Sequence, residues 1–334
     1  MQYPKTKSLY PETAFAASSW SDPIREEMAM VEIKLREIPP GEHQMLSGAI
    51  QGLFNAGGKR IRPSLCLLTA GLFNADIDHA IYLSAAVEML HTATLVHDDL
   101  IDGAMLRRGA PTLNSFWSSD IAVLSGDYLF ARAASMVSEV EIVPIMKLFA
   151  STLETILNGE ITQKFSKWQV DRNAYADRIY AKTAALFVLA TQSAALLGGA
   201  DRDSIDAFIN FGYSIGMAFQ IVDDILDYIG TPEKLGKPIG GDLHQGLFTL
   251  PAIYYAENNP QDEDMDTLYK SKEADPSLIQ RLITKIQSSG AIEASLQEAQ
   301  TIIKNGQGYL SLFPDSRYKD ALFDLTNEII NRDF

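Results

Sequence analysis

The stretch IDHAIYLSAAVEMLHTATLVHDDLID, residues 77 to 102, is apolar along most of its length and ends in three aspartates. Its apolar residues recur at three- and four-residue spacing, which is the period of an α-helix. The spacing of Asp98, Asp99 and Asp102 would put all three on one side of such a helix. The stretch therefore predicts an apolar helix that ends in a carboxylate face.

The same acidic pattern occurs a second time, in IVDDILD at residues 221 to 227, where it gives Asp223, Asp224 and Asp227. Two carboxylates at this spacing repel by roughly 3 kcal/mol at an effective dielectric of about 20, before any desolvation. The sequence therefore predicts a positive partner beside each cluster. A solvated surface face or a set of helix N-caps is the alternative, but both clusters come late in strongly apolar helices.

Both clusters offer oxygen ligands without a neighbouring pair of Cys or His. Oxygen donors suit a hard cation, and magnesium commonly completes its shell with water and with substrate phosphate oxygens. An EF-hand calcium loop would need alternating ligands in a glycine-containing loop, which neither cluster has. We therefore expect Mg²⁺ that binds together with a phosphorylated substrate.

Cations that could hold phosphate follow at several points. The stretch GGKRIRP, residues 57 to 63, combines a glycine pair, three cations and a helix-opening proline, so backbone N–H groups and charged side chains could hold a diphosphate there. A basic helix start on the surface is the alternative. Arg107 and Arg108 follow the first acidic cluster closely. Lys182 lies in an apolar helix and Lys237 in a glycine-rich loop, although either could be a surface lysine.

His91 lies two helical turns before Asp98, on roughly the same side of the predicted helix. A satisfied core histidine is the alternative. The five histidines show no metal-ligand spacing, and no Ser-His-Asp, P-loop or paired-glycine fingerprint occurs. Nucleophilic catalysis is therefore unsupported.

Apolar residues recur at helical spacing along nearly the whole chain, and no convincing alternating run indicates a sheet. The sequence therefore predicts an all-α fold, a single large helical bundle. The long helices are expected over residues 22–36, 77–102, 121–138, 143–168, 174–197 and 204–229. No low-complexity linker divides the chain, so we expect one domain over residues 1–334, with residues 1–20 as a flexible N-terminal segment.

The composition excludes several classes of protein. The net charge of −15 argues against binding of nucleic acid or of anionic lipid, which favour basic surfaces. Cys66, the single cysteine, lies in an apolar run, so a buried thiol in a reducing compartment is expected. The N-terminus lacks the apolar core of a signal peptide, and no later window has the uncharged apolar length that crosses a bilayer. We expect a cytoplasmic protein without a transmembrane segment.

Five motifs occur in order along the chain. They are GGKRIRP at 57–63, HTATLVHDDLIDGAMLRRGAPT at 91–112, GD at 126–127, YAKTAALF at 180–187, and GMAFQIVDDILDYIG at 216–230 followed by GKPIGGDLHQG at 236–246. With these motifs the chain resembles the class I trans-isoprenyl (polyprenyl) diphosphate synthases of medium- and long-chain type, from about Gly57 to Tyr255. The resemblance implies an isoprenoid synthase-like bundle around a deep central cavity, a homodimer, and three Mg²⁺ per active site.

The resemblance also implies roles for individual residues. The expected direct metal ligands are Asp98, Asp102 and Asp223, with Asp99, Asp224 and Asp227 completing the two faces through direct or water-mediated contacts. The residues expected to hold isopentenyl diphosphate are Lys59, Arg62, His91 and Arg108. Those expected to hold the allylic diphosphate are Arg107, Lys182 and Lys237, and those expected to line the reacting end are Thr183 and Gln220. The catalytic candidates are Asp98, Asp99, Asp102, Lys182, Asp223 and Asp224.

The implied reaction is head-to-tail condensation of isopentenyl diphosphate with an allylic diphosphate. The metals and cations would stabilise the departing diphosphate, so that the C–O bond breaks to an allylic cation that the isopentenyl double bond attacks. One departure from the family pattern is Gly246-Leu247-Phe248-Thr249, where many relatives have Gly-Lys-x-Thr. We interpret the apolar Leu247 as a mark of a long-chain subgroup.

Product length is predicted from the two positions just before the first cluster. In the family, bulky residues there form the floor of the hydrocarbon tunnel, whereas this chain has Ala93 and Thr94, which are small. One helical turn, about 5.4 Å, is comparable to one stretched isoprene unit. We therefore predict a product longer than C20, which would bring the enzyme near membranes.

Four other functions are alternatives. A short-chain farnesyl or geranylgeranyl diphosphate synthase, or the catalytic subunit of a heteromeric prenyl synthase, would carry the same motifs. A class I terpene cyclase shares the acidic metal face, but it needs no second diphosphate site, and Lys59 and Arg62 favour condensation. A non-catalytic regulatory subunit commonly loses aspartates, and all six are present here.

Overall fold

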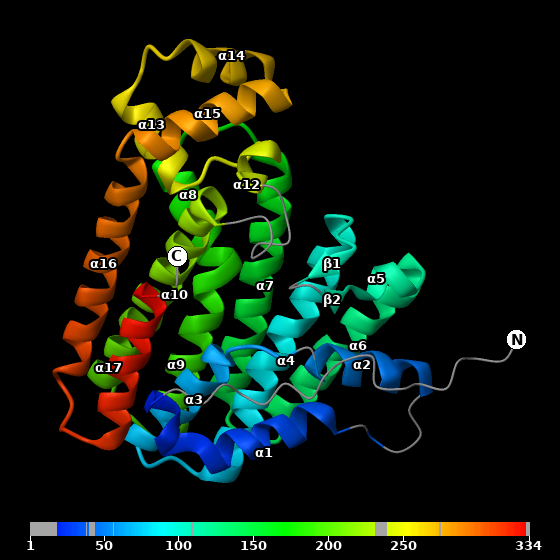
Figure 1. Cartoon of the computed structure of the whole chain (residues 1–334). Coiled ribbons are helices and arrows are strands. Elements are labelled where there is room, and N and C mark those ends of the chain that lie inside the picture. The colour runs from blue at the N-terminus through cyan, green and yellow to red at the C-terminus, as the bar shows by residue number, and fades with distance from the viewer. Residues whose placement is uncertain are drawn as a thin grey trace, which may run out of the picture. The chain divides into compact units, whose positions relative to one another are not determined.

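The computed structural model describes residues 19–37, 39, 44–55, 57–107, 110–230, 239–273 and 275–331. Arg108 and Lys237, two of the predicted substrate-binding residues, lie outside these ranges, as does most of the predicted N-terminal segment 1–20. Helices dominate the described part of the chain, so the predicted all-α fold is confirmed (Figure 1). The single β element there is a short antiparallel ladder that pairs Leu106 with Pro111 and Arg107 with Ala110.

The elements follow one another in a simple order. In the first part of the chain they are η1 (Ser19–Ile24), α1 (Arg25–Arg36), α2 (Gln44–Asn55), α3 (Ile61–Leu72), α4 (Ile77–Ile101), β1 (Leu106–Arg107), β2 (Ala110–Pro111), α5 (Leu113–Phe116), α6 (Ser119–Ser138) and α7 (Val143–Phe165). In the rest they are α8 (Arg172–Ile179), η2 (Tyr180–Ala184), α9 (Ala185–Leu197), α10 (Arg202–Ile229), α12 (Gly241–His244), α13 (Leu250–Asn258), α14 (Glu263–Ser271), α15 (Pro276–Ser288), α16 (Ala291–Leu310) and α17 (Arg317–Ile330).

The chain divides into two compact units. The first unit comprises residues 1–149, 190–205 and 315–322, and the second comprises residues 150–189, 206–314 and 323–334. The sequence-based expectation of one domain stays a prediction. The first acidic cluster lies in the first unit and the second acidic cluster in the second.

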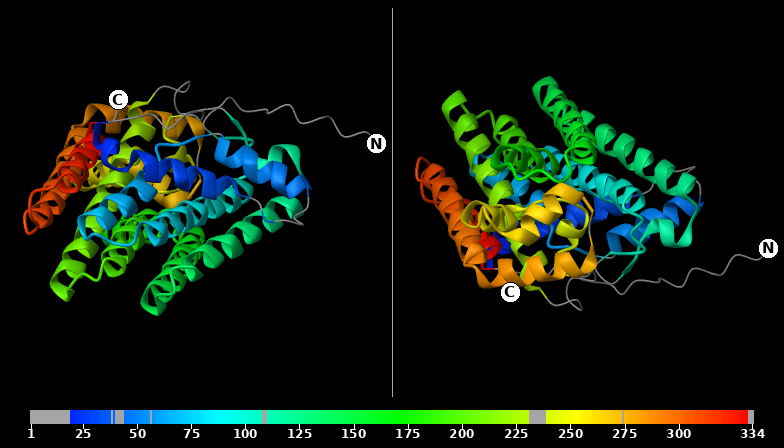
Figure 2. Two further views of the ribbon diagram at one scale, coloured as in Figure 1. Left: turned by 90° about the horizontal axis from the view of Figure 1, so that it is seen from below. Right: turned by 90° about the horizontal axis from the view of Figure 1, so that it is seen from above.

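In the first unit α4 is the central helix. It packs against α1, α3 and α6, which lie beside it in both views of the molecule (Figures 1 and 2). A helix that is apolar on all sides must be covered on all sides, and Leu83, Val87, Leu90 and Ala93 are all buried. The Asp76 side chain caps the helix by accepting a hydrogen bond from the His79 N–H at 3.0 Å.

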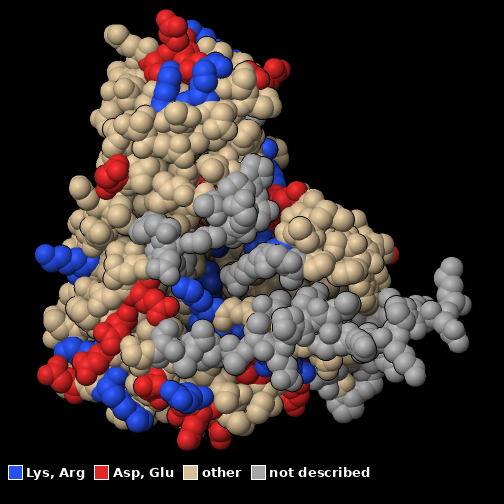
Figure 3. Space-filling model, viewed as in Figure 1, with Lys and Arg blue, Asp and Glu red and all other residues tan. Residues whose placement is uncertain are grey.

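In the second unit α10 presents an aromatic and aliphatic face to the core. Phe208 and Phe211 are fully buried, and the Phe208 ring also packs edge-on against Phe313, with ring centroids 5.2 Å apart. The helix α13 packs against α15 and α16. Over α14 and α15, acidic and basic side chains gather on the surface (Figure 3), where Lys285 bonds to Asp262 and Asp264 at 2.6 and 2.8 Å.

Most predicted helices occur within a few residues of the predicted bounds. The predicted helix 77–102 is α4, which ends at Ile101, and the predicted helix 204–229 is α10, which begins at Arg202. The predicted helix 143–168 ends earlier, at Phe165, and Trp168 has a positive φ of 63° that cannot continue a helix. The predicted helix 174–197 is interrupted, because residues Tyr180–Ala184 form a π-helical turn between α8 and α9.

Two described helical segments are long and apolar enough to cross a membrane, Arg172–Leu197 and Arg202–Ile229. The most apolar window of the first is 78% buried inside the structure, and that of the second is 61% buried. Buried core helices pass the same test of length and hydropathy. The predicted absence of a transmembrane segment stays a prediction. The Cys66 thiol is fully buried, as expected, and burial raises its pKa to about 12.

Candidate active site

The first acidic cluster forms the C-terminal end of α4. The Asp102 N–H donates to the Asp98 carbonyl oxygen at 2.9 Å, so the helical geometry continues through the cluster. Asp98 is half-buried and Asp102 is exposed, whereas Asp99 is buried. The three aspartates therefore do not share one exposed face, because the Asp99 side chain is buried in the protein.

Asp99 has the positive partner that the sequence called for. Arg107 Nε donates to Asp99 Oδ1 at 2.7 Å, and Arg107 is presented by the short β1 strand that follows the helix. Burial raises the pKa of Asp99, while the Arg107 guanidinium opposes this shift. Asn114 Nδ2 donates to the Ala104 carbonyl oxygen at 3.0 Å and so ties the chain after the cluster to α5.

The described residues among those predicted to hold isopentenyl diphosphate lie at two places in the first unit. Lys59 is exposed just before α3, and Arg62 is buried in the first turn of that helix. His91 is half-buried on α4, two turns before Asp98. Between Lys59 and Arg62, Arg60 is buried and bonded to Glu32 and Glu88. Arg60 of this motif is therefore bound to carboxylates of the protein.

The second acidic cluster lies near the C-terminal end of α10, in the second unit. Asp223 is half-buried, while Asp224 and Asp227 are buried, with exposed fractions of 3% and 2%. Asp227 Oδ2 accepts a hydrogen bond from the Asp242 N–H at 3.1 Å, and the Asp227 carbonyl accepts from the Gly240 N–H at 2.8 Å. These bonds fasten the chain that returns after the cluster to the end of the helix.

Both carboxylate oxygens of Asp224 accept hydrogen bonds from neutral side chains. Gln220 Nε2 donates to Oδ1 at 2.8 Å, and the Tyr175 hydroxyl donates to Oδ2 at 2.8 Å. Thr183 Oγ1 donates in turn to Gln220 Oε1 at 2.6 Å. Thr183 and Gln220, which were predicted to line the reacting end together, are therefore joined directly.

Burial dominates the electrostatics of Asp224. It raises the pKa of this carboxyl to about 8, and the nearby Asp242 charge adds to the increase, while the bonds from Gln220 and Tyr175 oppose it. Burial also raises the pKa of Tyr175 well above its usual value. The Arg178 guanidinium stacks 5.4 Å from the Tyr175 ring and donates to the Phe248 carbonyl oxygen at 2.7 Å.

Lys182 projects from the π-helical turn Tyr180–Ala184. Its ammonium donates to Glu160 Oε1 on α7 at 2.6 Å, and the lysine side chain is 35% exposed. A π turn inserts an extra residue into a helix and is frequent at functional sites. From this turn the adjacent residues Lys182 and Thr183 bond to two different partners, Glu160 and Gln220.

Leu247, which we interpreted as a mark of a long-chain subgroup, is buried with an exposed fraction of 7%. Its N–H donates to the Asp242 carbonyl oxygen at 2.9 Å. Ahead of it, Gly246 has a φ of 82°, and its carbonyl accepts a bond from the Trp168 N–H at 2.8 Å. A side chain on Gly246 would overlap the Trp168 ring, so this turn needs glycine.

The two positions predicted to set product length differ in their surroundings. Ala93 is fully buried, and Thr94 is half-buried with its hydroxyl bonded to the His91 carbonyl oxygen at 2.7 Å. The open tunnel past these residues stays a prediction.

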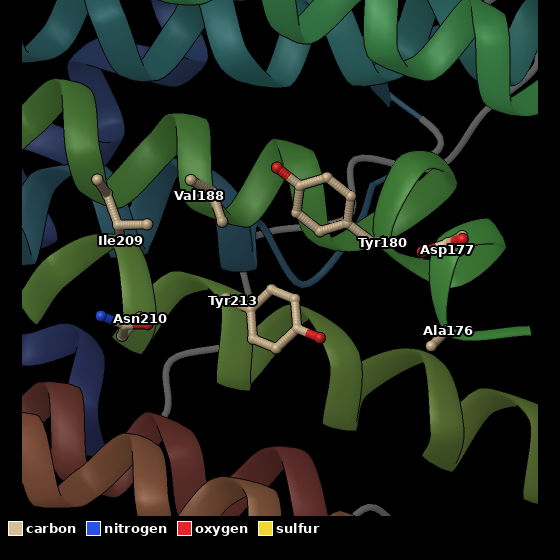
Figure 4. Close-up of a pocket in the computed structure, with 7 residues that line it drawn as sticks. All are labelled: Ala176, Asp177, Tyr180, Val188, Ile209, Asn210 and Tyr213. Carbon is tan, nitrogen blue, oxygen red and sulfur yellow. The ribbon is translucent and has the colours of Figure 1, made fainter. Parts of the chain in front are cut away.

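A cavity of about 420 Å³ lies in the second unit, on α8, the π turn and α10 (Figure 4). The rings of Tyr180 and Tyr213 lie side by side there, with centroids 5.8 Å apart. Its other lining residues are Ala176, Asp177, Val188, Ile209 and Asn210. None of the predicted site residues lines this cavity, although Tyr180 begins the turn that carries Lys182.

The aspartates of each cluster offer oxygen donors alone. Among the described residues, no three His, Cys, Asp or Glu side chains gather closely enough to enclose a metal ion. The half-buried Asp98 and Asp223 and the exposed Asp102 present carboxylate oxygens alone. Carboxylate oxygens are ligands that suit magnesium, which keeps several waters and shares its shell with phosphate oxygens.

Three residues with clear contacts in these sites were missed from the sequence. The sequence pattern predicts the same phosphate-binding role for Arg60 as for its cationic neighbours, and it marks neither Glu160 nor Tyr175. Tyr175 lies 49 residues before its partner Asp224, and Glu160 lies 22 residues before Lys182. No local spacing signals such long-range pairs.

Known proteins resemble the chain over nearly its whole length. The family model for polyprenyl synthetase matches residues 43–286. Component 2 of heptaprenyl diphosphate synthase from Bacillus subtilis is 36% identical over 313 residues, which are 93% of this chain and 89% of that protein. The all-trans-nonaprenyl-diphosphate synthase (geranyl-diphosphate specific) of Rhodobacter capsulatus is 37% identical over 93% of this chain and 96% of that protein.

A solved structure agrees with the fold as well. The polyprenyl synthase of Caulobacter crescentus, complexed with calcium and isoprenyl diphosphate, matches with a TM-score of 0.84 and 32% identity. The match covers 96% of this chain and 99% of that one. The predicted fold class and the predicted family are both confirmed. The chain belongs to the polyprenyl synthetase family and is a prenyltransferase.

Proposed function

We propose that the chain is a trans-polyprenyl diphosphate synthase, which condenses isopentenyl diphosphate head-to-tail with an allylic diphosphate to a product longer than C20. The observation that carries the proposal is the pair of DDxxD clusters at the ends of apolar helices in a chain of this family. The names of the heptaprenyl and nonaprenyl diphosphate synthases support a product of this length.

Divalent cations, magnesium by our proposal and three per active site, would be held by Asp98, Asp102 and Asp223. When bound, they would neutralise the diphosphate and stabilise it as a leaving group. Asp99 and Asp224 already accept hydrogen bonds from protein side chains, which supports an indirect role for both. Asp227, bonded to the Asp242 N–H, belongs with them.

The cations of the chain would bind the two diphosphates. Isopentenyl diphosphate would be held by Lys59, Arg62, His91 and Arg108, and the allylic diphosphate by Arg107, Lys182 and Lys237. Lys182 would have to share its ammonium between Glu160 and the phosphate oxygens, since the 2.6 Å bond already uses one of its three donors. The Thr183–Gln220 hydrogen bond would fix both side chains at the reacting end.

A second candidate is the catalytic subunit of a two-component synthase. The observation that favours it is the 36% identity to component 2 of the Bacillus subtilis heptaprenyl diphosphate synthase. Against it we propose a homodimer that is active alone, located in the cytoplasm. Activity of the purified chain without any other protein separates the two assignments.

The test incubates purified protein with farnesyl diphosphate, radiolabelled isopentenyl diphosphate and magnesium, and sizes the extracted products by chromatography. EDTA and an Asp98→Ala variant serve as controls. A metal-dependent ladder that ends beyond C20 supports the proposal, while a C15 or C20 endpoint refutes the product length alone. No product from well-folded protein would favour the two-component assignment or a cyclase.

A further inference from the structure

Arg60 lies between two residues proposed to bind isopentenyl diphosphate, and its side chain is bound to carboxylates of the protein. Lys59 before it is exposed, whereas Arg60 itself is only 6% exposed. Arg60 has a left-handed backbone, with a φ of 49°, directly before the first residue of α3. A residue other than glycine adopts a left-handed backbone conformation only at a cost in free energy, so the surrounding contacts must hold Arg60 there.

The contacts that hold Arg60 come from three other elements of the first unit. Its Nε donates to Glu32 Oε1 on α1 at 2.6 Å, and its Nη1 donates to Glu88 Oε1 on α4 at 2.9 Å. Its Nη2 donates to the Phe54 carbonyl oxygen at the end of α2 at 3.1 Å. The planar guanidinium can satisfy all three directions at once, which a lysine ammonium on a flexible stem does less well.

The backbone of Arg60 is fastened as firmly as its side chain. The Arg60 carbonyl oxygen accepts from the Ser64 N–H at 3.0 Å and from Ser64 Oγ at 2.7 Å, which starts α3 at this residue. Lys59 and Arg62 lie one residue before and two residues after this anchor. A change in the backbone conformation of Arg60 would therefore redirect the side chains of both Lys59 and Arg62.

Glu88 connects this anchor to the other proposed substrate-binding element. It lies on α4, three residues before His91, and its side chain is only 8% exposed. The Glu88 carbonyl accepts from Thr92 Oγ1 at 2.9 Å within the same helix. The ion pair Arg60–Glu88 therefore joins the start of α3 to the turn of α4 that carries His91 (α3 and α4 are side by side in Figures 1 and 2).

General stability does not account well for this arrangement. A buried ion pair is often no more stabilising than apolar residues of the same volume, because both charges lose their hydration. Here the pair also holds a backbone conformation that disfavours a side chain. The ion pair and the backbone conformation together fix the local geometry at the start of α3.

We propose that Arg60, through Glu32 and Glu88, is a positioning residue that sets the relative placement of Lys59, Arg62 and His91, and so determines the affinity for isopentenyl diphosphate. Arg60 itself does not touch the substrate. The inference rests on the proposed function, because it names the residue that organises one of the two diphosphate sites.

The test compares wild type with Glu88→Gln and Arg60→Lys. Glu88→Gln keeps the shape of the side chain and one oxygen acceptor, so it carries the test if Arg60→Lys does not fold. We expect the KM for isopentenyl diphosphate to rise about fivefold or more in both variants, while the KM for the allylic diphosphate and kcat change less than about twofold. Calorimetric titration with isopentenyl diphosphate alone should show the same loss of affinity.

The matched control is Lys285→Gln. Lys285 also bridges two carboxylates, Asp262 and Asp264, but it lies on α15 in the other unit. This control should lose stability without changing either KM, which separates positioning from a general weakening of the fold.

Two results would overturn parts of the account separately. Equal changes in both KM values, or unchanged binding of isopentenyl diphosphate in a folded Glu88→Gln variant, would show that Arg60 is merely structural. If wild type neither binds isopentenyl diphosphate nor forms product, the proposed function itself fails, and the variants are not needed to decide it.

Discussion

The two DDxxD clusters have one sequence pattern and two different surroundings. In the first, the middle aspartate Asp99 pairs with a cation, Arg107, whose side chain is 41% exposed. In the second, the equivalent Asp224 is almost fully buried and receives hydrogen bonds from the neutral Gln220 and Tyr175. The carboxyl group of the middle aspartate is thus stabilised by a charged partner in the first cluster and by neutral hydrogen-bond donors in the second.

The comparison indicates that the first and second aspartates of each cluster have different roles. In both clusters the second aspartate is buried and hydrogen-bonded within the protein, and the first is more open to a ligand. The second aspartates fix their surroundings, Arg107 in one case and the Gln220–Thr183 pair in the other. The first aspartates remain the better candidates for metal.

The largest effect is expected from removing those first aspartates. Asp98→Ala and Asp223→Ala should each lower kcat about 10²–10³-fold or more, because each removes charge that holds the proposed cations at the leaving group. Product formation from radiolabelled isopentenyl diphosphate measures the loss, and circular dichroism checks the fold. Should either variant keep most of its activity, the two clusters would not share a metal-binding role.

The matched controls lie on the same two helices. Asp78 and Asp203 are exposed acidic residues in the first turns of α4 and α10. Asp78→Asn and Asp203→Asn should leave turnover within about twofold, since only a small interaction with the helix dipole is lost.

Two glycines, Gly216 and Gly126, let neighbouring elements approach closely the segments that carry predicted site residues. We expect the two positions to differ in how well they tolerate substitution by alanine. A Cβ on Gly216 of α10 would overlap the backbone of Ala184 in the π turn, while one on Gly126 of α6 would overlap the His97 ring on α4. Backbone cannot move aside as a ring can. We expect Gly216→Ala to cost about 3 kcal/mol of unfolding free energy and Gly126→Ala about 1 kcal/mol.

Denaturant unfolding measures this difference, with Gly308→Ala as the control. Gly308 lies on the exposed face of α16 with nothing within 4 Å of an added Cβ, so alanine there should be neutral or slightly stabilising. Equal costs at Gly126 and Gly216 would mean that the contact at Ala184 can relax.

The pH dependence of stability should differ between the clusters in metal-free protein. The pKa of Asp224 is raised to about 8 in the folded state, whereas the unfolded carboxyl ionises near 4. Between these values the folded state binds the extra proton, so Asp224 contributes a stability loss that grows as pH rises, by at most about 1.4 kcal/mol per pH unit. Below pH 4 this contribution disappears.

Urea unfolding in EDTA from pH 5 to 8 tests this expectation in wild type and Asp224→Asn. The variant should gain stability relative to wild type as pH rises, and Asp99→Asn should show less of this trend because Arg107 opposes the shift at Asp99. Parallel curves for wild type and Asp224→Asn would contradict it.

The smallest effect concerns the partners of the two middle aspartates. Arg107→Ala and Tyr175→Phe should each cost about 1 kcal/mol of unfolding free energy. The cost of Arg107→Ala should shrink between about 0.05 and 0.5 M salt, since a partly exposed ion pair is screened. The cost of Tyr175→Phe should not change with salt. If both costs depended on salt in the same way, Asp99 and Asp224 would not differ in having a charged and a neutral partner.

The sequence predicted the helices and the acidic clusters well, because both depend on local spacing. The repeated apolar period gave α4 and α10 nearly to the residue, and the aspartates lie on these helices as expected. The Thr183–Gln220 pairing also agrees with the role that the family resemblance implied for both residues.

What the sequence did not predict depends on contacts between distant segments. The sequence motif around Arg60 looks uniformly basic, and only Glu32 and Glu88, each 28 residues away, show that this arginine points inward. Likewise the spacing of Asp223, Asp224 and Asp227 suggests one shared face, while Tyr175 and Asp242 turn two of its members toward the protein. Such outcomes are set by packing, which local periodicity does not encode.

The π turn Tyr180–Ala184 bears on how this segment tolerates changes in length. Deleting one residue from it would leave a continuous α-helix from α8 into α9, a change that a hydropathy pattern would hardly register. Because the extra residue is accommodated inside the turn, α8 and α9 would keep nearly the same phase after the deletion. The change would therefore fall on the turn itself, where Lys182 and Thr183 bond to Glu160 and Gln220, so a single-residue deletion there would alter these two contacts and leave the flanking helices in place.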